Sequence, residues 1–341
     1  MANRPFGGQY FMTNPDHFPS ISIAVFAHNE EASIGACLKS LLAAAGPVGA
    51  ALTRVVVLAN GCTDSTDQRV LDLAREDCRI QLCRISLGDK ANAWNTYVHD
   101  LCSEEHEHCL HLFVDGDITC TPGTIEAVCA AVRRSPTAHA VSVLPAIGVG
   151  RNRALNVRLY EEDGAIFGNF YALTGEFLRD IRVRGIRIPR FSMGEDVIVG
   201  EMVCFSLDRR NPYDNRRAVL ASPTEGFVYR SLSAWRWLDM RLYLGRRIRY
   251  RIRAWQTAFL RFCNFQDMPE TMHPVNEAIL SAISGSISVS PIRHLARKSL
   301  QRFAERHPVE QASSARIHRP NALEHRGERK GAVCQSEEIS V

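Results

Sequence analysis

Two aspartates separated by one glycine follow an apolar run in the middle of the chain. Residues 111–114 lead directly into Asp115-Gly116-Asp117. Such a run suits a buried strand of a parallel sheet, and ligands gather at the carboxyl ends of those strands. Two carboxylates one residue apart, with a glycine that permits a tight turn, suit Mg²⁺ or Mn²⁺ bound together with substrate phosphates. One such triplet is expected by chance in roughly every chain of this length, so its surroundings decide what it means.

The elements that must position this triplet are strands and helices in alternation. Apolar, β-branched runs predict strands at 21–27, 54–59, 80–85, 110–114 and 140–144. Amphipathic spacing, capping residues and Pro122 predict helices after Asn29, over 65–76 and 90–101, and from Thr121. This alternation implies a mostly parallel, right-handed, doubly wound α/β sheet flanked by helices, with a cleft above the strand ends.

Polar residues collect where three of these strands end. They are His28-Asn29-Glu30, residues 60–64 and Asp115-Gly116-Asp117. Because the carboxyl ends of parallel strands share one edge of the sheet, we expect these groups to lie together. A purely structural sheet has no need of acids there, so the sequence predicts a ligand site at this edge.

Composition limits the classes of protein that the chain can belong to. Its 341 residues are 45% hydrophobic and 23% charged, enough for a large core, and the net charge of +4 favours no nucleic acid partner. Eleven cysteines fall in apolar segments without a C-x-x-C pair, which is typical of a reducing cytosol. Neither a signal peptide nor a run of about eighteen apolar residues is present. We therefore expect a cytoplasmic protein, soluble or peripheral at the inner face of a membrane.

The second half of the chain has a different pattern. From about Arg151 it becomes mixed, with strand-like runs at 166–173 and 226–232, and Gly194-Glu195-Asp196 precedes an apolar helical stretch. From Tyr229 to Arg261 there are nine arginines, interleaved with aromatic residues, and one acid. This segment has three interpretations: a groove for a diphosphate, a helix on an anionic membrane surface involving residues 233–262, or a solvated face. The arginines surround the helix instead of leaving an apolar stripe, which weakens the membrane interpretation.

Several motifs in this order resemble glycosyltransferase family 2. IAVFAHNEEASIGACLKSL is similar to the family's opening strand, N-E pair and helix, and VVVLANGCTDST to its second turn. GDKANAWN, VDGD and GED resemble the glycine-lysine helix start, the metal motif and the acceptor-side E-D pair. The resemblance implies a GT-A, Rossmann-like fold with a helical C-terminal extension. The implied parts are an N-terminal arm (1–20), a nucleotide-sugar half (21–150), an acceptor half (151–232), a basic helical extension (233–307) and a disordered tail (308–341).

The resemblance also implies roles for individual residues. Asp117, with Asp115, would hold Mn²⁺ or Mg²⁺, and Asp196 would act as the general base in an inverting transfer, with Glu195 beside it. Asp115 would also contact the nucleotide-sugar. The other implied contacts to the donor are Ala27, His28, Asn29, Glu30, Asn60, Asp64, Lys90, Arg246 and Arg249.

The sequence departs from the family pattern at two places. Ala59-Asn60 replaces a pair of aspartates, and Asn60 would have to hydrogen-bond the nucleobase. Arg246 and Tyr250 replace glutamine and tryptophan of the Q-x-x-R-W motif of processive members. We therefore expect transfer of one sugar per acceptor, with the acceptor left open among lipids, saccharides, small natural products and peptides.

Structural roles compete with each of these functional ones. Asp115 and Asp117 could form a solvated turn, Asn29 and Glu30 could cap a helix, and Lys90 could lie on the surface. A sugar nucleotidyltransferase would use similar parts but needs a glycine-rich loop, which FAHNEE is not. A noncatalytic nucleotide-sugar-binding protein is the alternative from another class, and it would not need Asp117 and Asp196.

Overall fold

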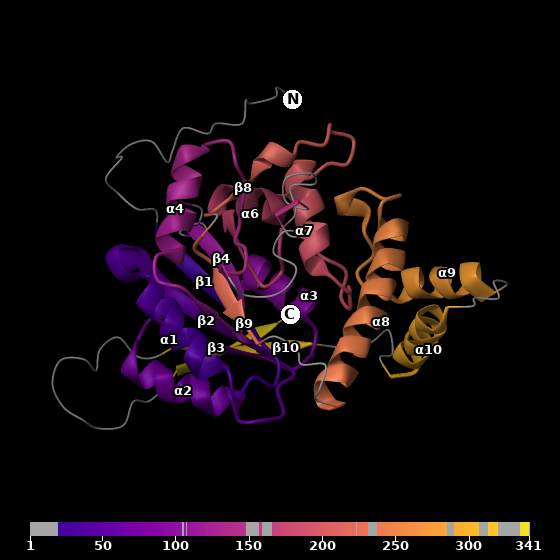
Figure 1. Ribbon diagram of the computed structural model, residues 1–341, viewed down its shortest axis with the longest axis horizontal. Coiled ribbons are helices and arrows are strands. Elements are labelled where there is room, and N and C mark those ends of the chain that lie inside the picture. Colours follow the sequence, from indigo (N-terminus) through magenta and orange to yellow (C-terminus); the bar gives the residue numbers. More distant parts are fainter. Residues whose placement is uncertain are drawn as a thin grey trace.

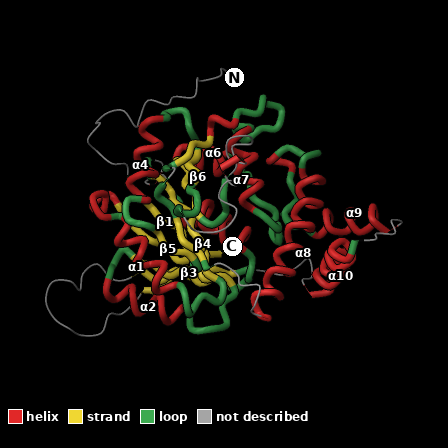
Figure 2. The backbone as a smooth tube through the Cα atoms, viewed as in Figure 1, coloured by secondary structure: helices red, strands yellow, loops and turns green. Residues whose placement is uncertain are grey.

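The computed structural model describes residues 20–103, 106, 108–147, 157–158, 166–222, 224–230, 237–284, 290–306, 313–319 and 335–340. Nine strands among them form one sheet, in the order β11-β10-β3-β2-β1-β4-β7-β6-β8. Figure 2 shows the strands in yellow, with helices in red around them. The strands are β1 (Ile21–Ala27), β2 (Leu52–Asn60), β3 (Ile80–Ile85), β4 (Leu110–Asp115), β6 (Ala140–Ser142), β7 (Phe170–Thr174), β8 (Ala218–Leu220), β10 (Ser314–Arg319) and β11 (Gln335–Ser340). A separate antiparallel pair joins β5 (Ile118–Cys120) to β9 (Phe227–Tyr229).

Helices cover both faces of the sheet. They are α1 (Ile34–Ala44), α2 (Thr66–Glu76), α3 (Lys90–Asn95), α4 (Thr124–Arg134), α6 (Gly175–Val183), α7 (Glu195–Cys204), α8 (Trp237–Leu260), α9 (His273–Ser284) and α10 (Pro291–Arg306). Side chains alternate along each strand, so successive residues of β1 enter different cores. Ile23 and Val25 pack with α1, α2 and α4, whereas Ala24 and Phe26 pack with α3, α6 and α7.

The direction of the strands changes after β4. β1 pairs in parallel with β2 and β4, and β2 pairs in parallel with β3, as the alternating pattern predicts. β7 then pairs antiparallel with β4, and β6 lies beyond β7. The mostly parallel sheet flanked by helices is confirmed, and its antiparallel part carries the segment leading to α7.

One predicted helix boundary is wrong. α1 begins at Ile34, not directly after Asn29, whose φ of 58° places it in the left-handed region outside any helix. Residues 28–33 form a turn, which leaves the polar groups after β1 at the sheet edge.

Helix α8 connects the sheet to the C-terminal helices. It lies between the α/β body and α9 and α10 (Figure 1). Ile252 of α8 packs with Ile279 of α9 and with Ala296 and Leu300 of α10 in a separate small core. No helix in the described part of the chain has the length and apolar character that crossing a membrane requires.

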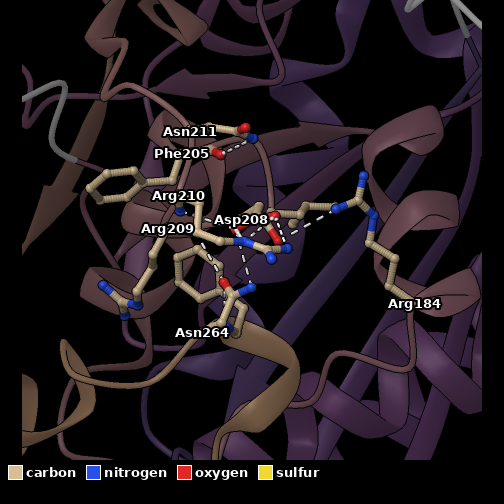
Figure 3. Close-up of polar contacts among 9 residues, drawn as sticks. Arg184, Phe205, Asp208, Arg209, Arg210, Asn211 and Asn264 are labelled. Atoms are coloured by element: carbon tan, nitrogen blue, oxygen red, sulfur yellow. Dashed lines mark hydrogen bonds and ion pairs between the residues drawn. The ribbon is translucent and has the colours of Figure 1, made fainter. Parts of the chain in front are cut away.

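A polar cluster fixes the end of α8 to the body. Asp208, in the loop after α7, accepts hydrogen bonds from Arg210 at 2.6 Å and from Asn264 at 3.1 Å (Figure 3). Asn264 in turn accepts one from the Arg209 backbone at 3.0 Å. These contacts set the position of α8 relative to α7, which matters because both helices contribute to the cleft.

The prediction of a disordered tail is wrong for two of its segments. β10 pairs antiparallel with β3 and β11 pairs with β10, which extends the sheet at that edge. Ala315 and Ile317 are buried. The polar composition of this segment concealed a strand whose hydrogen bonds come from a distant part of the chain.

Candidate active site

The loops after β1, β2 and β4 meet at one edge of the sheet. In the strand register, Ala27 lies opposite Ala59, and Phe26 lies opposite Asp115. The polar groups that follow these strands therefore emerge side by side, as the sequence predicted. Gly116 allows this packing, because a Cβ there would lie 3.0 Å from the Phe26 carbonyl oxygen.

Lys90 joins the two motifs that carry the carboxylates. Its ammonium lies 2.6 Å from Asp115 Oδ1 and 2.8 Å from Glu195 Oε1, and it donates to the Gly168 carbonyl at 3.0 Å. An ammonium has three N–H donors, and all three are thus engaged. The anionic partners expected for Lys90 are therefore carboxylates of the protein. A contact between Lys90 and the nucleotide-sugar stays a prediction.

The D-x-D aspartates differ in their freedom to bind a cation. Both oxygens of Asp115 have partners, because Oδ1 pairs with Lys90 and Oδ2 accepts a hydrogen bond from Asn169 at 3.1 Å. Burial raises the pKa of Asp115 to about 6, although the charge of Lys90 opposes this shift. Asp117 is exposed and has no hydrogen-bond or ion-pair partner in the described part of the chain. Within those same residues, no three His, Cys, Asp or Glu side chains are arranged to hold a metal. These carboxylates suit a divalent cation that is bound by one or two protein ligands and whose other ligands are substrate phosphates and water.

Asp196 occupies a different environment on the other side of the α7 N-terminus. Its side chain is 15% exposed, and its Oδ1, 3.6 Å from Arg253 Nη2, accepts no hydrogen bond among the described residues. Burial, and then the charge of Glu195, raises the pKa of Asp196, while Arg253 opposes the shift. Gly168 packs against it, because a Cβ there would lie 3.0 Å from Asp196 Oδ2. A buried carboxylate with a raised pKa and an unused oxygen can accept a proton.

Helix α8 holds the loop that leads into Asp196. Arg253 Nε donates to the Met193 carbonyl at 3.2 Å, and Gln256 Oε1 accepts from the Met193 backbone N–H at 2.9 Å. Gly194 has a φ of 113°, and a Cβ there would lie 2.2 Å from Arg253 Nε. Sequence reasoning missed Arg253 and Gln256 as site residues. The arginine-rich helix was recognised, but its arginines lie all around it, so their spacing does not identify the one that faces the cleft.

Asp89 is a third residue that sequence reasoning missed. It caps α3 by accepting from the backbone N–H groups of Ala91 and Asn92, and it accepts from Phe191 N–H at 2.8 Å. Burial raises its pKa to about 6. The side chain next to Lys90 thus ties the start of α3 to the loop before α7. The sequence feature that could have identified Asp89 as a site residue is its position in the GDK motif, directly before Lys90.

The side chain of Asn60 is held within the sheet edge, and its contact with a nucleobase stays a prediction. It is 4% exposed, and its amide donates to the carbonyls of Ala27 at 2.9 Å and Leu58 at 3.3 Å. Its own carbonyl lies 2.6 Å from Nδ1 of the exposed His28. The amide N–H groups of Asn60 are therefore used within the sheet edge, and the Ala27 carbonyl is occupied in the same way.

The remaining residues of the first two loops bind one another. Asn29 Oδ1 accepts from the Thr63 backbone N–H at 2.7 Å, and Asp64 Oδ2 accepts from the Glu31 backbone N–H at 3.1 Å. Burial raises the pKa of Glu30, the charges of Asp117 and Asp64 add to the shift, and a hydrogen bond from Ser33 opposes it. The structure thus brings Asn29, Glu30 and Asp64 together at the same edge as the D-x-D motif.

Arg246 and Arg249 lie on α8, the helix that also carries Arg253. Trp237 and Tyr243, nearer the start of this helix, are 70% and 57% exposed. Contact of this segment with a membrane surface stays a prediction.

Comparisons with known proteins agree with this architecture. No curated protein sequence matches the chain significantly. The mannosyltransferase PcManGT from Pyrobaculum calidifontis, solved in complex with GDP-Man and Mn²⁺, superposes with a TM-score of 0.54 at 19% identity, over 86% of this chain and 83% of that one. S. aureus TarS 1-349 with UDP-GlcNAc gives 0.48 at 16% identity, over 82% and 79% of the two chains. The profile of glycosyl transferase family 2 matches residues 22–205, more than half of the sequence. The chain belongs to this family and is a glycosyltransferase of the GT-A fold.

Proposed function

We propose that the protein is an inverting, divalent-metal-dependent hexosyltransferase that moves one sugar from a nucleotide-diphosphate sugar to an acceptor hydroxyl. The observation that carries this proposal is the Lys90 bridge. It joins Asp115 of the D-x-D motif to Glu195, the neighbour of Asp196. Groups suited to a leaving group and to a nucleophile are thereby held on either side of one lysine.

On the donor side, Asp117 would be the principal ligand of Mn²⁺ or Mg²⁺, with Asp115 beside it. When bound, the cation would neutralise charge on the departing nucleoside diphosphate. The Mn²⁺ and GDP-Man bound by PcManGT support this choice of cofactor and donor class. The loops containing His28, Glu30 and Asp64 would line the nucleoside end.

On the acceptor side, Asp196 would be the general base. It would take the proton of an acceptor hydroxyl as that oxygen bonds to the anomeric carbon and the bond from that carbon to the diphosphate oxygen breaks. A single displacement of this kind inverts the configuration and needs one carboxylate on the acceptor side. The raised pKa of Asp196, and an oxygen that accepts no hydrogen bond among the described residues, support the role.

The test is a donor panel with two variants. Purified protein with Mn²⁺ is incubated with nucleotide-sugars and alcohol acceptors, and nucleoside diphosphate release and product configuration are measured. We expect Asp117→Ala to weaken donor binding. Asp196→Asn should keep donor binding but lower transfer by about 10²-fold or more, because a positioned base contributes that much.

Asp72→Asn, an exposed carboxylate on α2, is the matched control and should behave like the wild type. Turnover equal to wild type in either site variant would refute the assignment, as would a product of retained configuration. Pyrophosphate release would indicate a nucleotidyltransferase. Donor binding without release of any product, across donors and acceptors, would favour the noncatalytic alternative.

A further inference from the structure

Three arginines of α8 share one face of the helix. Arg246, Arg249 and Arg253 are spaced i, i+3 and i+7, which places their side chains in one row. The sequence from Met240 to Leu260 contains no acidic residue that could neutralise them from within the helix. Neither Arg246 nor Arg249 has an ion-pair or hydrogen-bond partner among the described residues. Arg246 and Arg249 therefore carry positive charge that the described part of the protein leaves uncompensated, whereas Arg253 faces Asp196.

The row lies on the Asp196 side of the helix. Arg253 contacts the Met193 carbonyl and lies 3.6 Å from Asp196. Ile252, about 100° around the helix from Arg253, packs instead against α9 and α10. Arg246 and Arg249 lie two turns and one turn from Arg253 along the same face of the helix.

The guanidinium groups are close enough to influence one another. The pKa of Arg249 is lowered, first by partial removal from water and then by the charge of Arg246, with Arg253 adding to it, although the side chain is exposed overall. An anion that bonds to several of these like charges at once relieves their mutual repulsion. Guanidinium forks match the oxygens of phosphate in particular.

The start of α7 indicates which substrate this anion belongs to. Glu195 and Asp196 are consecutive, so their side chains diverge by about 100° around the helix. Glu195 turns to Lys90 and the D-x-D motif, whereas Asp196 turns to Arg253. The arginine row thus lies on the side of the proposed base, away from the aspartates assigned to the donor.

We propose that the acceptor carries a phosphate group, which Arg246 and Arg249 bind while its hydroxyl lies at Asp196. This inference rests on the proposed function and names the acceptor class for the same site. It also moves the two arginines from the donor, where sequence reasoning placed them, to the acceptor. The phosphate can belong to a soluble sugar or polyol phosphate or to a lipid headgroup.

The test uses acceptors in matched pairs with the donor that the panel selects. The pairs are glycerol 3-phosphate with glycerol, mannose 6-phosphate with mannose, and phosphatidylcholine vesicles containing phosphatidylglycerol with the same vesicles containing diacylglycerol. We expect the phosphorylated member of at least one pair to have a kcat/KM higher by about tenfold or more. The pair that responds distinguishes a soluble source from a lipid source.

Arg246→Ala/Arg249→Ala should raise the KM for the phosphorylated acceptor about tenfold or more and leave donor affinity and metal-dependent donor hydrolysis unchanged. Arg247→Ala is the matched control. It removes the same charge from the same helix, but its side chain is exposed and donates to Tyr243. Equal use of the neutral acceptors would overturn the inference. A comparable loss of donor affinity in the double variant would also overturn it, because the arginines would then serve the donor.

A binding measurement separates failure of the inference from failure of the proposed function. Inorganic phosphate should raise the melting temperature of the wild type and of Arg247→Ala, but not that of Arg246→Ala/Arg249→Ala. If phosphate binds in this pattern and no donor reacts, the anion site stands and the transferase assignment falls. If sugar is transferred and phosphate stabilises all three proteins equally or not at all, the inference falls alone.

Discussion

Replacing Lys90 by methionine tests whether the bridge between the two motifs holds the cleft together. Methionine keeps most of the side-chain volume but removes the charge and the three hydrogen bonds. Asp115 and Glu195 would then face each other across the cleft without a cation, and both lie largely out of water, with exposed fractions of 25% and 9%. The substitution therefore isolates the electrostatic contribution of the bridge.

The expected cost is about 3 kcal/mol of unfolding free energy, the lower end of the 3–5 kcal/mol that follows removal of one partner from a buried ion pair. The lower end applies because Asp115 is partly exposed and can take up a proton. Its pKa is already raised to about 6 by burial, and loss of Lys90 removes the main opposing charge. Protonation of Asp115 below that pKa relieves the penalty, so the difference from wild type should shrink as the pH falls from 7 to 5.

Urea unfolding at pH 7 and pH 5 measures both quantities. Lys39→Met, at an exposed position on α1, is the matched control and should lie within about 0.5 kcal/mol of wild type at either pH. If Lys90→Met unfolds within about 1 kcal/mol of Lys39→Met at pH 7, the bridge is a solvated surface pair and the reasoning is wrong. A penalty that grows towards pH 5 would contradict the role assigned to Asp115.

Two further predictions concern regions away from the cleft. Burial lowers the pKa of His111 to about 3, so this residue stays neutral in the folded protein while the unfolded chain takes up a proton below about 6.5. The contribution of His111 to the unfolding free energy is complete above pH 6.5 and should fall by about 2 kcal/mol by pH 5. Urea unfolding at the two pH values should show this loss in the wild type but not in His111→Asn. An equal loss in both proteins would contradict the prediction. Ile317→Ala should lower the unfolding free energy by about 2–5 kcal/mol, because the side chain is 1% exposed in β10. A change under about 1 kcal/mol in a denaturant titration would show that β10 contributes little to the sheet.

The core of the sheet could be predicted because its signals are local. Each strand of the parallel part is a short apolar run, and each following helix shows its own amphipathic period, so the order of elements follows from short windows of sequence. The strand-end rule then places Asp115 and the loops after β1 and β2 at one edge without knowledge of side-chain positions. That reasoning placed the candidate site, and the motifs, taken in their order, resembled the family to which the chain belongs.

The parts that could not be predicted depend on pairing between distant residues. β10 has an ordinary polar composition, and only its pairing with β3, about 230 residues earlier in the sequence, makes it a strand. Lys90 looked like a ligand for an external anion, but its partners lie 25 and 105 residues away along the chain. Arg253 is one of several similar arginines, and only the packing of α8 against the loop before α7 selects it. The periodicity of a sequence does not indicate which distant residues contact one another.

The start of α7 explains how two adjacent acids can differ in function. Burial acts to raise the pKa of Glu195, but the charge and hydrogen bond of Lys90, a backbone hydrogen bond and the charge of Arg253 together outweigh it, and the net shift is downward. Asp196 has no such cation in hydrogen-bond contact, and burial together with the charge of Glu195 raises its pKa. Titratable neighbours whose pKa values are pushed apart are the pairs in which acid–base roles separate. Glu195 is therefore suited to remain an anion that orients Lys90, and of the two carboxylates Asp196 is the better candidate to accept the proton of an incoming hydroxyl.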